Sequence, residues 1–287
     1  MLELAKDEVY KINGLLETFA HQLVVPAILA GRAPARCWVD ALDAPSIAVA
    51  WDLVNGLVFC AGAPEVDDTA KRLGSFLLSE LLPLAHSKGY PRLYVEFAPA
   101  SLLEQVERGL AGREVSRESL LFYALAPEDT APDLPAPTLA DEGLARVRLT
   151  PDLVSLDLAN MDELRMCIDA CWRDRARYFQ EGIGYAAVHS DIVASWCSTD
   201  YVLGGQADLY VETFAGYKGR GLATWVAAGC VEACRSKGWP THWHCWSNNA
   251  GSRRVAEKVG LRLVQETPIL SLGTQGGAST SQDLRAG

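Results

Sequence analysis

Residues 211–223 read VETFAGYKGRGLA, and this stretch decides how the second half of the sequence is interpreted. It begins as a β-strand, passes through a short turn with three glycines, and enters a helix. Glycines let the backbone of such a turn approach a ligand closely, and the helix N-terminus adds unpaired N–H donors at the positive end of its dipole. Lys218 and Arg220 add full positive charge. The stretch therefore predicts a cradle for a pyrophosphate group.

Two nucleotide-binding motifs share part of this pattern and fail on particular residues. A P-loop needs Lys and then Ser or Thr at its end, whereas Leu222 and Ala223 follow Gly221. A dinucleotide-binding turn needs a third glycine where Thr224 stands. Simple turn chemistry, with no ligand at all, is the remaining alternative for a glycine pair of this kind.

Two motifs in the right order resemble the GNAT superfamily of N-acetyltransferases. Lys218–Ala223, KGRGLA, is similar to the family's (Arg/Gln)-x-x-Gly-x-(Gly/Ala) motif, with Lys in the first place. Asn249–Ser252 followed by Ala256–Leu261, AEKVGL, is similar to its Asn-x-x-Ala … Tyr-Glu-Lys-x-Gly-Phe helix. The separation between the two motifs fits one helix and one strand. The resemblance covers about Arg146–Leu272.

Further residues resemble one branch of that superfamily, the zwittermicin-resistance acetyltransferases. Glu212-Thr213 stands before the turn, and Pro240-x-x-Trp243-x-Cys245 lies on the next predicted strand. Members of that branch also carry an extra N-terminal region, as this chain does.

The resemblance implies a site for acetyl-CoA or another acyl-CoA as acyl donor. Backbone groups of Val211, Glu212 and Thr213 would pair with the pantetheine arm like an added strand. Asn249 would cap its helix or touch the pantetheine, with Ser252 one turn further on. The acyl thioester would lie where two neighbouring strands splay apart. The pyrophosphate would be held by the charges and amides of Lys218, Gly219, Arg220, Gly221, Leu222 and Ala223.

The resemblance also implies direct transfer of the acyl group. An amine, deprotonated by a base or through water, would attack the thioester carbonyl, while a backbone N–H stabilises the oxyanion and an acid protonates the thiolate. The family's usual acid is a Tyr that falls at Ala256. That role is therefore lost, filled by water or moved to another residue.

Four side chains are candidates for catalysis. Glu212 would flank the thioester and is the first candidate for a base or an amine-orienting group, with a structural strand carboxylate as the alternative. Asp208 lies on the same strand face and is a weaker candidate. His242 and His244 alternate onto one face of the next strand, where either could relay a proton. A wall histidine is the alternative for both, since the sequence offers no third metal ligand.

The eight cysteines favour packing over a metal site or disulfides. None forms a CxxC pair, and Cys167/Cys171 and Cys230/Cys234 are spaced i,i+4 within predicted helices. No secretory signal is evident. We therefore expect a reduced, cytoplasmic protein with free thiols and no metal, with structural zinc as the second alternative.

Composition limits the partners. The 287 residues are 49% hydrophobic and 22% charged, which is ordinary for a globular protein. A formal net charge of −10 argues against bulk binding to nucleic acid or anionic membrane. Residues 1–140 hold 11 basic and 19 acidic side chains, whereas residues 141–287 hold 15 and 17. The second half is therefore the expected place for an anionic ligand.

The chain is predicted to be a tandem protein of α+β (mixed α/β) class. Each half would be a GNAT-like, largely antiparallel mixed sheet flanked by helices. Both halves follow the order strands, long helix, strand, short helix, strand; a helix is expected over 161–178 and a last strand over 261–264. The predicted parts are a degenerate GNAT-like domain over 1–126, a Pro-rich linker over 127–143, an acyltransferase domain over 144–272 and a disordered tail over 273–287.

The expected function is transfer of an acyl group, acetyl above all, from CoA to an amine of a small molecule, as in modification of a natural product or antibiotic. One alternative is a biosynthetic acyltransferase that takes a larger acyl group from CoA or an acyl carrier protein. An anionic acceptor group or an acidic carrier domain could dock on Arg173–Arg177, RDRAR, although a solvated face is the simpler interpretation. The other alternative is a non-catalytic acyl-CoA sensor. A monomer or a homodimer is expected.

Overall fold

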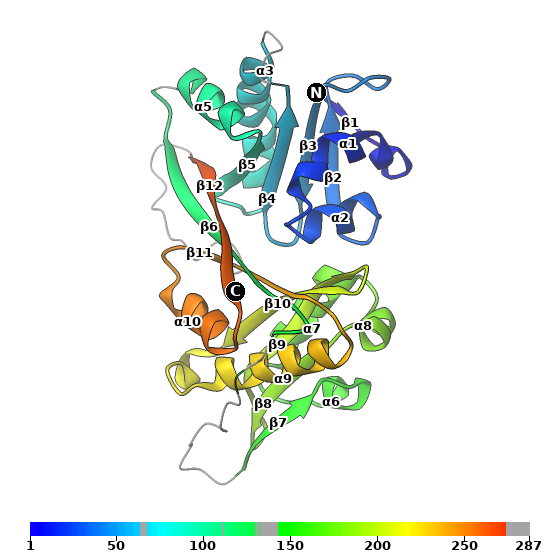
Figure 1. Cartoon of the computed structure of the whole chain (residues 1–287), viewed down its shortest axis with the longest axis vertical. Helices are drawn as coiled ribbons and strands as arrows, with labels where there is room; N and C mark the ends of the chain where they lie inside the picture. Colours follow the sequence, from blue (N-terminus) through cyan, green and yellow to red (C-terminus); the bar gives the residue numbers. More distant parts are fainter. Residues whose placement is uncertain (64–67, 111, 130–131, 133–142, 274–287) are drawn as a thin grey trace. The chain divides into compact units, whose positions relative to one another are not determined.

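The computed structural model of the protein describes residues 1–63, 68–110, 112–129, 132 and 143–273. They form two units (Figure 1). Unit 1 consists of Met1–Leu120 together with the end of the last strand, from Thr267 onward. Unit 2 consists of Leu121–Glu266.

Unit 1 is built on a mixed sheet in the order β1-β2-β3-β4-β5-β12. The strands β1 to β4 pair in antiparallel fashion, β4 and β5 are parallel, and the end of β12 is antiparallel to β5. The strands are β1 (Leu2–Glu3), β2 (Ala35–Val39), β3 (Ile47–Asp52), β4 (Leu57–Gly62), β5 (Arg92–Ala98) and β12 (Arg262–Gly273).

The helices of unit 1 enclose an apolar core. Trp51 and Leu73 are fully buried, and they belong to one cluster with the apolar side chains of β4, β5 and α5. The helical segments are η1 (Lys6–Ile12), α1 (Asn13–Leu16), η2 (Glu17–Phe19), α2 (Val24–Leu29), α3 (Thr69–Phe76), η3 (Leu77–Leu81), α4 (Leu82–Ser87) and α5 (Ala100–Gly109).

Unit 2 is built on a second run of strands in the order β6-β11-β10-β9-β8-β7. The strands are β6 (Val115–Leu125), β7 (Leu144–Arg148), β8 (Gly184–His189), β9 (Ile192–Leu203), β10 (Gln206–Thr213) and β11 (Thr241–Trp246). The helical segments are α6 (Pro151–Ser155), α7 (Met161–Trp172), α8 (Arg175–Glu181), η4 (Ala215–Tyr217), α9 (Leu222–Ser236) and α10 (Ala250–Lys258).

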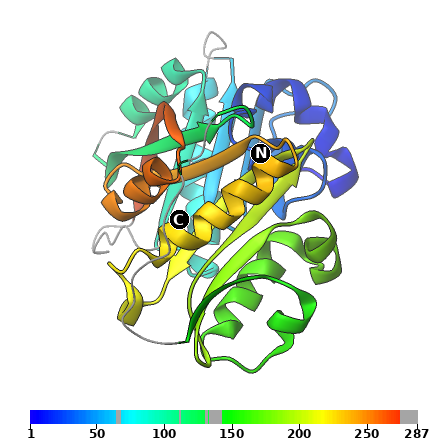
Figure 2. The same ribbon diagram turned by 60° about the horizontal axis from the view of Figure 1, so that its bottom comes forward.

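Helix α9 covers one face of the strands of unit 2, and Figure 2 shows it in yellow lying across them. Its Leu222, Val226 and Cys230 share a buried cluster with Val211 of β10 and Trp243 of β11. Side chains alternate along a strand. The even-numbered residues of β11, and those of β10 after Leu209, therefore lie on the face opposite to α9.

Two strands change unit along their length. β6 begins in unit 1 and ends in unit 2 beside β11, whereas β12 begins in unit 2 and ends in unit 1. There Leu270 pairs with Val95 of β5. Each half of the sequence thus contributes its last strand to the other unit, which a division at 126 and 144 did not predict. Most of the predicted linker and the tail after Gly273 lie outside the described residues.

Two predicted elements differ from the structure. The helix expected over 161–178 is divided, because Arg173 takes a left-handed backbone conformation and the Asp174 carboxylate caps a new helix by accepting from Ala176 N at 2.8 Å. The strand expected over 261–264 continues to Gly273, because its second part joins the sheet of unit 1.

The cysteine side chains bear on the expectation of free thiols, and the helices on the expectation of no membrane binding. All eight cysteine side chains are buried and none forms a disulfide. Among the residues that the structure describes, no helix combines the length and the apolar character needed to cross a membrane.

Candidate functional site

The two central strands of unit 2 separate after a short paired stretch. β10 and β11 pair at Ala207 with Thr241 and at Asp208 with His242, and both strands then continue beyond this two-pair ladder. A bulge lies on the other side of β10 at the same level, where Asp208 pairs with Tyr201 but Leu209 with Thr199. A bulge bends its strand and increases the local twist, which accounts for a separation at this point.

The separation leaves one edge of β10 free. Phe214 N donates to Ala194 O of β9 at 3.1 Å, and backbone groups alternate between the two edges of an antiparallel strand. Glu212 therefore directs its backbone toward β9, whereas Val211 and Thr213 direct theirs into the gap. Of the three residues predicted to bind the pantetheine arm, Val211 and Thr213 direct backbone groups into the gap, and Thr213 N is engaged by the Glu212 carboxylate at 3.1 Å; binding of the arm stays a prediction.

The glycine turn lies directly after β10. Gly219 and Gly221 have φ angles of 79° and 82°, which L-residues with side chains rarely adopt. Gly221 is the N-cap of α9 and has no side chain that could cap the helix, so it leaves the first N–H groups of α9 without the usual N-cap partner. Lys218 and Arg220 are exposed beside them. The role of this turn as a pyrophosphate cradle stays a prediction.

An aromatic residue supports the turn and was not predicted. The Arg220 guanidinium lies 5.5 Å from the centre of the Tyr217 ring, a cation–π contact. The Tyr217 hydroxyl lies 3.2 Å from Nδ1 of His189, at the end of β8. No local pattern could have indicated this pair, because β8 and the turn are far apart in the sequence.

The second predicted motif is largely structural. Asn249 Oδ1 accepts from Ser252 N at 3.0 Å and caps α10. Ser252 is buried, and its hydroxyl accepts from Trp243 Nε1 at 2.9 Å. Ala256 is fully buried in the same cluster as α9. Asn249 therefore has the capping role that was one of its two predicted roles, and contact with pantetheine stays a prediction.

Glu212 is held by its neighbours on β10. Its carboxylate accepts from the Tyr210 hydroxyl at 3.2 Å and from Thr213 N at 3.1 Å. The Ser195 hydroxyl of β9 donates to the Glu212 carbonyl at 2.8 Å. The partly exposed carboxylate is thus fixed in place, and its role as base or amine-orienting group stays a prediction.

Asp208 and His244, separate candidates in the sequence, meet across the gap. Oδ1 of Asp208 lies 3.3 Å from Nδ1 of His244, and both side chains are 15% exposed. Phe122 of β6 stacks on the His244 ring, with centroids 4.9 Å apart and planes at 18°. It meets His242 edge-on at 5.3 Å. Nε2 of His244 is buried with no hydrogen-bond partner among the described residues.

Cys245 is a poor nucleophile. Cys245 lies on β11 close to the gap, but burial raises the pKa of its thiol to about 11, so it is protonated at neutral pH. Cys167, Cys171 and Asp200 bring potential metal-ligand atoms within 4.8 Å of one another and could hold an ion. In the structure the Cys167 thiol lies 3.9 Å from an Asp200 carboxylate oxygen, within hydrogen-bond range for sulfur.

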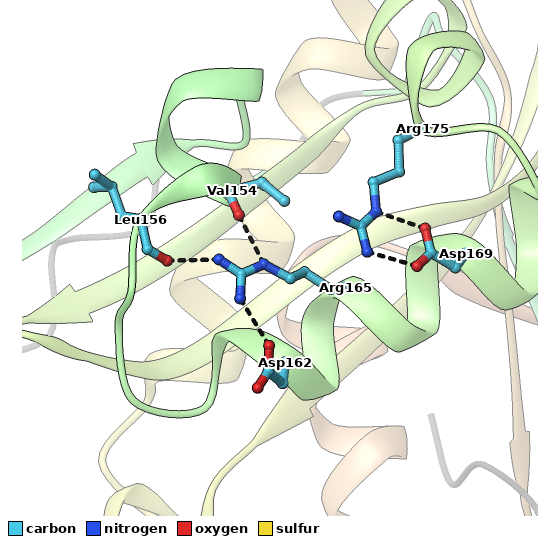
Figure 3. Close-up of polar contacts among 6 residues, drawn as sticks. All are labelled: Val154, Leu156, Asp162, Arg165, Asp169 and Arg175. Carbon is cyan, nitrogen blue, oxygen red and sulfur yellow. Dashed lines mark hydrogen bonds and ion pairs between the residues drawn. The ribbon is translucent and has the colours of Figure 1, made fainter.

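The arginines of α7 and α8 are engaged locally. Arg175 makes two hydrogen bonds of 2.6 Å to Asp169, as Figure 3 shows. Arg165, in the same view, donates to the carbonyls of Val154 and Leu156 and to Asp162. Of the predicted Arg173–Arg177 patch, Arg175 thus has its charge paired.

A family model described as GNAT acetyltransferase matches residues 151–270. An uncharacterized N-acetyltransferase of Bacillus subtilis, YdfB, is 27% identical over 132 residues, which is 46% of this chain and 49% of that protein. The aligned part thus spans about half the length of the curated relative.

Solved structures share the fold across both halves. A GCN5-related N-acetyltransferase-like protein from Streptococcus suis has a TM-score of 0.65 at 18% identity, over 93% of this chain and 98% of that one. A GCN5-related N-acetyltransferase from Sphaerobacter thermophilus has a TM-score of 0.61 at 14% identity, over 98% and 97%. A tandem GNAT protein from the clavulanic acid biosynthesis pathway has a TM-score of 0.56 at 16% identity, over 97% and 99%. The predicted α+β tandem fold is confirmed.

Proposed function

We propose, from the match of residues 151–270 to a GNAT acetyltransferase family model, that the protein transfers an acetyl group from acetyl-CoA to an amine of a small molecule. One observation carries the proposal. The same strand, β10, has a free edge where it leaves β11 and a glycine turn at the head of α9 directly after it. A free strand edge and an open helix N-terminus match the two halves of CoA, an amide-containing arm and a pyrophosphate.

Each half of the cofactor has a partner of matching chemistry. The pantetheine arm contains amide groups, so it can pair with the backbone groups of Val211 and with the carbonyl of Thr213 as an added strand does, while Thr213 N is engaged by the Glu212 carboxylate. The pyrophosphate is anionic, so the N–H groups of the turn, the dipole of α9 and the charges of Lys218 and Arg220 favour it. The arm then runs from the turn along β10 toward the point where β10 and β11 separate.

The strand pairing of unit 1 supports the proposal that each chain has one site, in unit 2. The equivalent strands of unit 1, β4 and β5, stay paired over five residue pairs, from Leu57 with Tyr94 to Ala61 with Ala98. An arm has no free edge to join there. We therefore propose that unit 1 is a degenerate copy of the acyltransferase domain and that unit 2 holds the working site.

The test is a calorimetric titration of the full chain with acetyl-CoA, followed by assays of thiol release with a panel of small primary amines. We expect one acetyl-CoA per chain and release of CoA with at least one amine. Absence of binding would contradict the proposal, and binding of two molecules would contradict the degenerate role of unit 1. Binding without thiol release for any amine would instead favour the non-catalytic sensor.

The donor is tested in the same assays. Turnover with a longer acyl-CoA or an acyl carrier protein, but not with acetyl-CoA, would favour the biosynthetic alternative. The local pairing of Arg175 with Asp169 leaves less free charge for an acidic carrier, which supports CoA as the donor. Modification of a natural product, and membership of the zwittermicin-resistance branch, stay predictions about the acceptor.

A further inference from the structure

Direct acyl transfer from CoA needs a group that protonates the leaving thiolate, and α10 does not provide it. Ala256 stands where the resembling family has a Tyr, and its methyl group is fully buried among the apolar side chains of unit 2. A methyl group cannot donate a proton. If the chain catalyses the proposed reaction, the proton comes from water or from another residue near the gap.

Asp208 and His244 form an acid–base pair at the base of the gap. A carboxylate can only accept a hydrogen bond, so the 3.3 Å contact between Asp208 and Nδ1 of His244 favours the tautomer with a proton on Nδ1. Nε2 of His244 then carries a lone pair. Stacking against Phe122 fixes the plane of the ring and therefore the direction of that lone pair.

The unpartnered nitrogen points to a ligand. A buried polar atom without a hydrogen bond costs free energy, and native structures leave few of them. Nε2 of His244 is buried and has no partner in the described part of the chain. The other face of the same gap is filled by Val211, Trp243 and the side chains of α9. A substrate group in the gap would complete the hydrogen bonding of Nε2.

The position of the pair fits the thioester end of the cofactor. From Thr213, beside the glycine turn, to Asp208 is about 17 Å of extended strand. An arm bound at the turn and laid along this edge carries its thioester away from the turn, toward Asp208. Glu212 lies about 13 Å from Asp208 along the same strand. The pair is therefore closer than Glu212 to the expected place of the reacting sulfur.

We propose that His244, oriented by Asp208, carries the proton from the attacking amine to the leaving thiolate. This rests on the proposed function. The amine nitrogen forms a bond to the thioester carbonyl carbon, and Nε2 takes a proton from that nitrogen. The C–S bond then breaks, and the imidazolium returns the proton from Nε2 to the sulfur. One residue serves as base and then as acid, so no hydroxyl is needed at position 256.

The experiment measures release of CoA thiol from acetyl-CoA with hydroxylamine as acceptor, because so small a nucleophile does not depend on the shape of an acceptor pocket. His244→Gln should lower kcat by about 10²–10⁴-fold and leave the Kd of acetyl-CoA unchanged. Added imidazole should restore part of the rate. An unchanged kcat in His244→Gln would overturn the proposal.

Asp208 is a positioning residue, and its test separates orientation from packing. In Asp208→Asn, long-range ¹H–¹⁵N spectra of the full chain should show the His244 ring gaining protonation at Nε2, with a loss of kcat smaller than in His244→Gln. An unchanged tautomer would contradict the role of Asp208. His86→Gln is the control for the substitution, since His86 lies on α4 of unit 1, outside the proposed site; its kcat should stay close to that of the wild type.

The outcomes distinguish this inference from the proposed function. If the wild type binds acetyl-CoA but His244→Gln is as active as the wild type, the cofactor site stands and the proton carrier is wrong. The proton carrier is also wrong if the wild type binds acetyl-CoA and releases no thiol to hydroxylamine. If the wild type does not bind acetyl-CoA, the proposed function fails and the inference fails with it.

Discussion

The strand pair β4/β5 of unit 1 and the strand pair β10/β11 of unit 2 occupy the same place in the order of elements and end differently. Both are parallel pairs joined through a helical connection. β4 and β5 stay paired over five residue pairs, whereas β10 and β11 pair over two. A bulge beside Asp208 accompanies the early separation in unit 2. The same architecture thus gives a closed sheet in one unit and an open edge in the other.

The charged residues on the strand pairs β4/β5 and β10/β11 also differ in how they are engaged. In unit 1 the buried carboxylate of Glu96 accepts from Gln22 Nε2 at 3.0 Å and lies 3.5 Å from Nε2 of His21. In unit 2 the pair of Asp208 and His244 leaves one ring nitrogen without a partner in the described chain. Glu96 of unit 1 is thus engaged by two neighbouring side chains, whereas Nε2 of His244 in unit 2 is open to the chemistry proposed above.

The largest effect should come from a substitution that distorts the glycine turn before α9. Gly221→Val places a β-branched residue at a φ of 82°, which distorts the cradle at the head of α9. We expect the Kd of acetyl-CoA to rise by more than about 100-fold, equivalent to ~2.7 kcal/mol, measured by calorimetry.

Gly216→Ala is the matched control for that change. Gly216 belongs to the same turn, has no positive φ, and an added Cβ would meet no atom within 4 Å. Its Kd should equal that of the wild type. An unchanged Kd in Gly221→Val would remove the contrast between the two units, because the turn would then not bind the cofactor.

The second prediction concerns the contact between β5 and the end of β12 in unit 1. Buried Arg92 of β5 donates to the Ser271 hydroxyl of β12 at 2.7 Å and to Glu114 at 2.9 Å. Arg92→Leu should lower the free energy of unfolding by about 2 kcal/mol, because it removes the hydrogen bonds that the charged guanidinium donates to Ser271 and Glu114. Urea unfolding measures the loss.

Arg117→Leu is the control, since Arg117 also pairs with a carboxylate, that of Glu107, but is 48% exposed. Its stability should not change measurably. If the units are independent in function, folded Arg92→Leu protein should bind acetyl-CoA like the wild type. A weakened Kd would show instead that unit 1 takes part in binding.

The third prediction separates charge from backbone in the cradle. Arg220→Gln removes a full charge while keeping the turn, so the Kd of acetyl-CoA should rise by about tenfold. The difference from wild type should shrink at high ionic strength, because exposed charges are screened. Arg148→Gln, which changes an exposed arginine of β7, is the control and should have no effect. A salt-independent difference would argue against direct contact with the pyrophosphate.

The smallest effect should come from Asn249. Asn249→Ala removes the cap of α10 and should cost about 1 kcal/mol in the free energy of unfolding. Asn249→Asp, which keeps a capping oxygen, should retain most of the stability. Equal acetyl-CoA affinity in all three proteins is expected if the cap is its whole role. A higher Kd in Asn249→Ala alone would establish the contact with pantetheine.

Local patterns predicted most of the elements, for reasons that the structure makes clear. The strand and helix around the glycine turn follow from residues that are neighbours in sequence, and so does the capping Asn249. The break at Arg173 was missed, because the left-handed residue and the Asp174 cap interrupt an apolar periodicity that continues through them. The length of β12 was missed because its second part depends on pairing with β5.

The sequence by itself determined the order of elements, the glycine turn with its two positive charges, and the absence of a hydroxyl at position 256, since each depends on neighbouring residues. Only the tertiary structure decided which edge of β10 is free, which unit receives β6 and β12, and that Asp208 meets His244. Those outcomes depend on strand pairing between distant segments and on a single bulge, and no local periodicity encodes either.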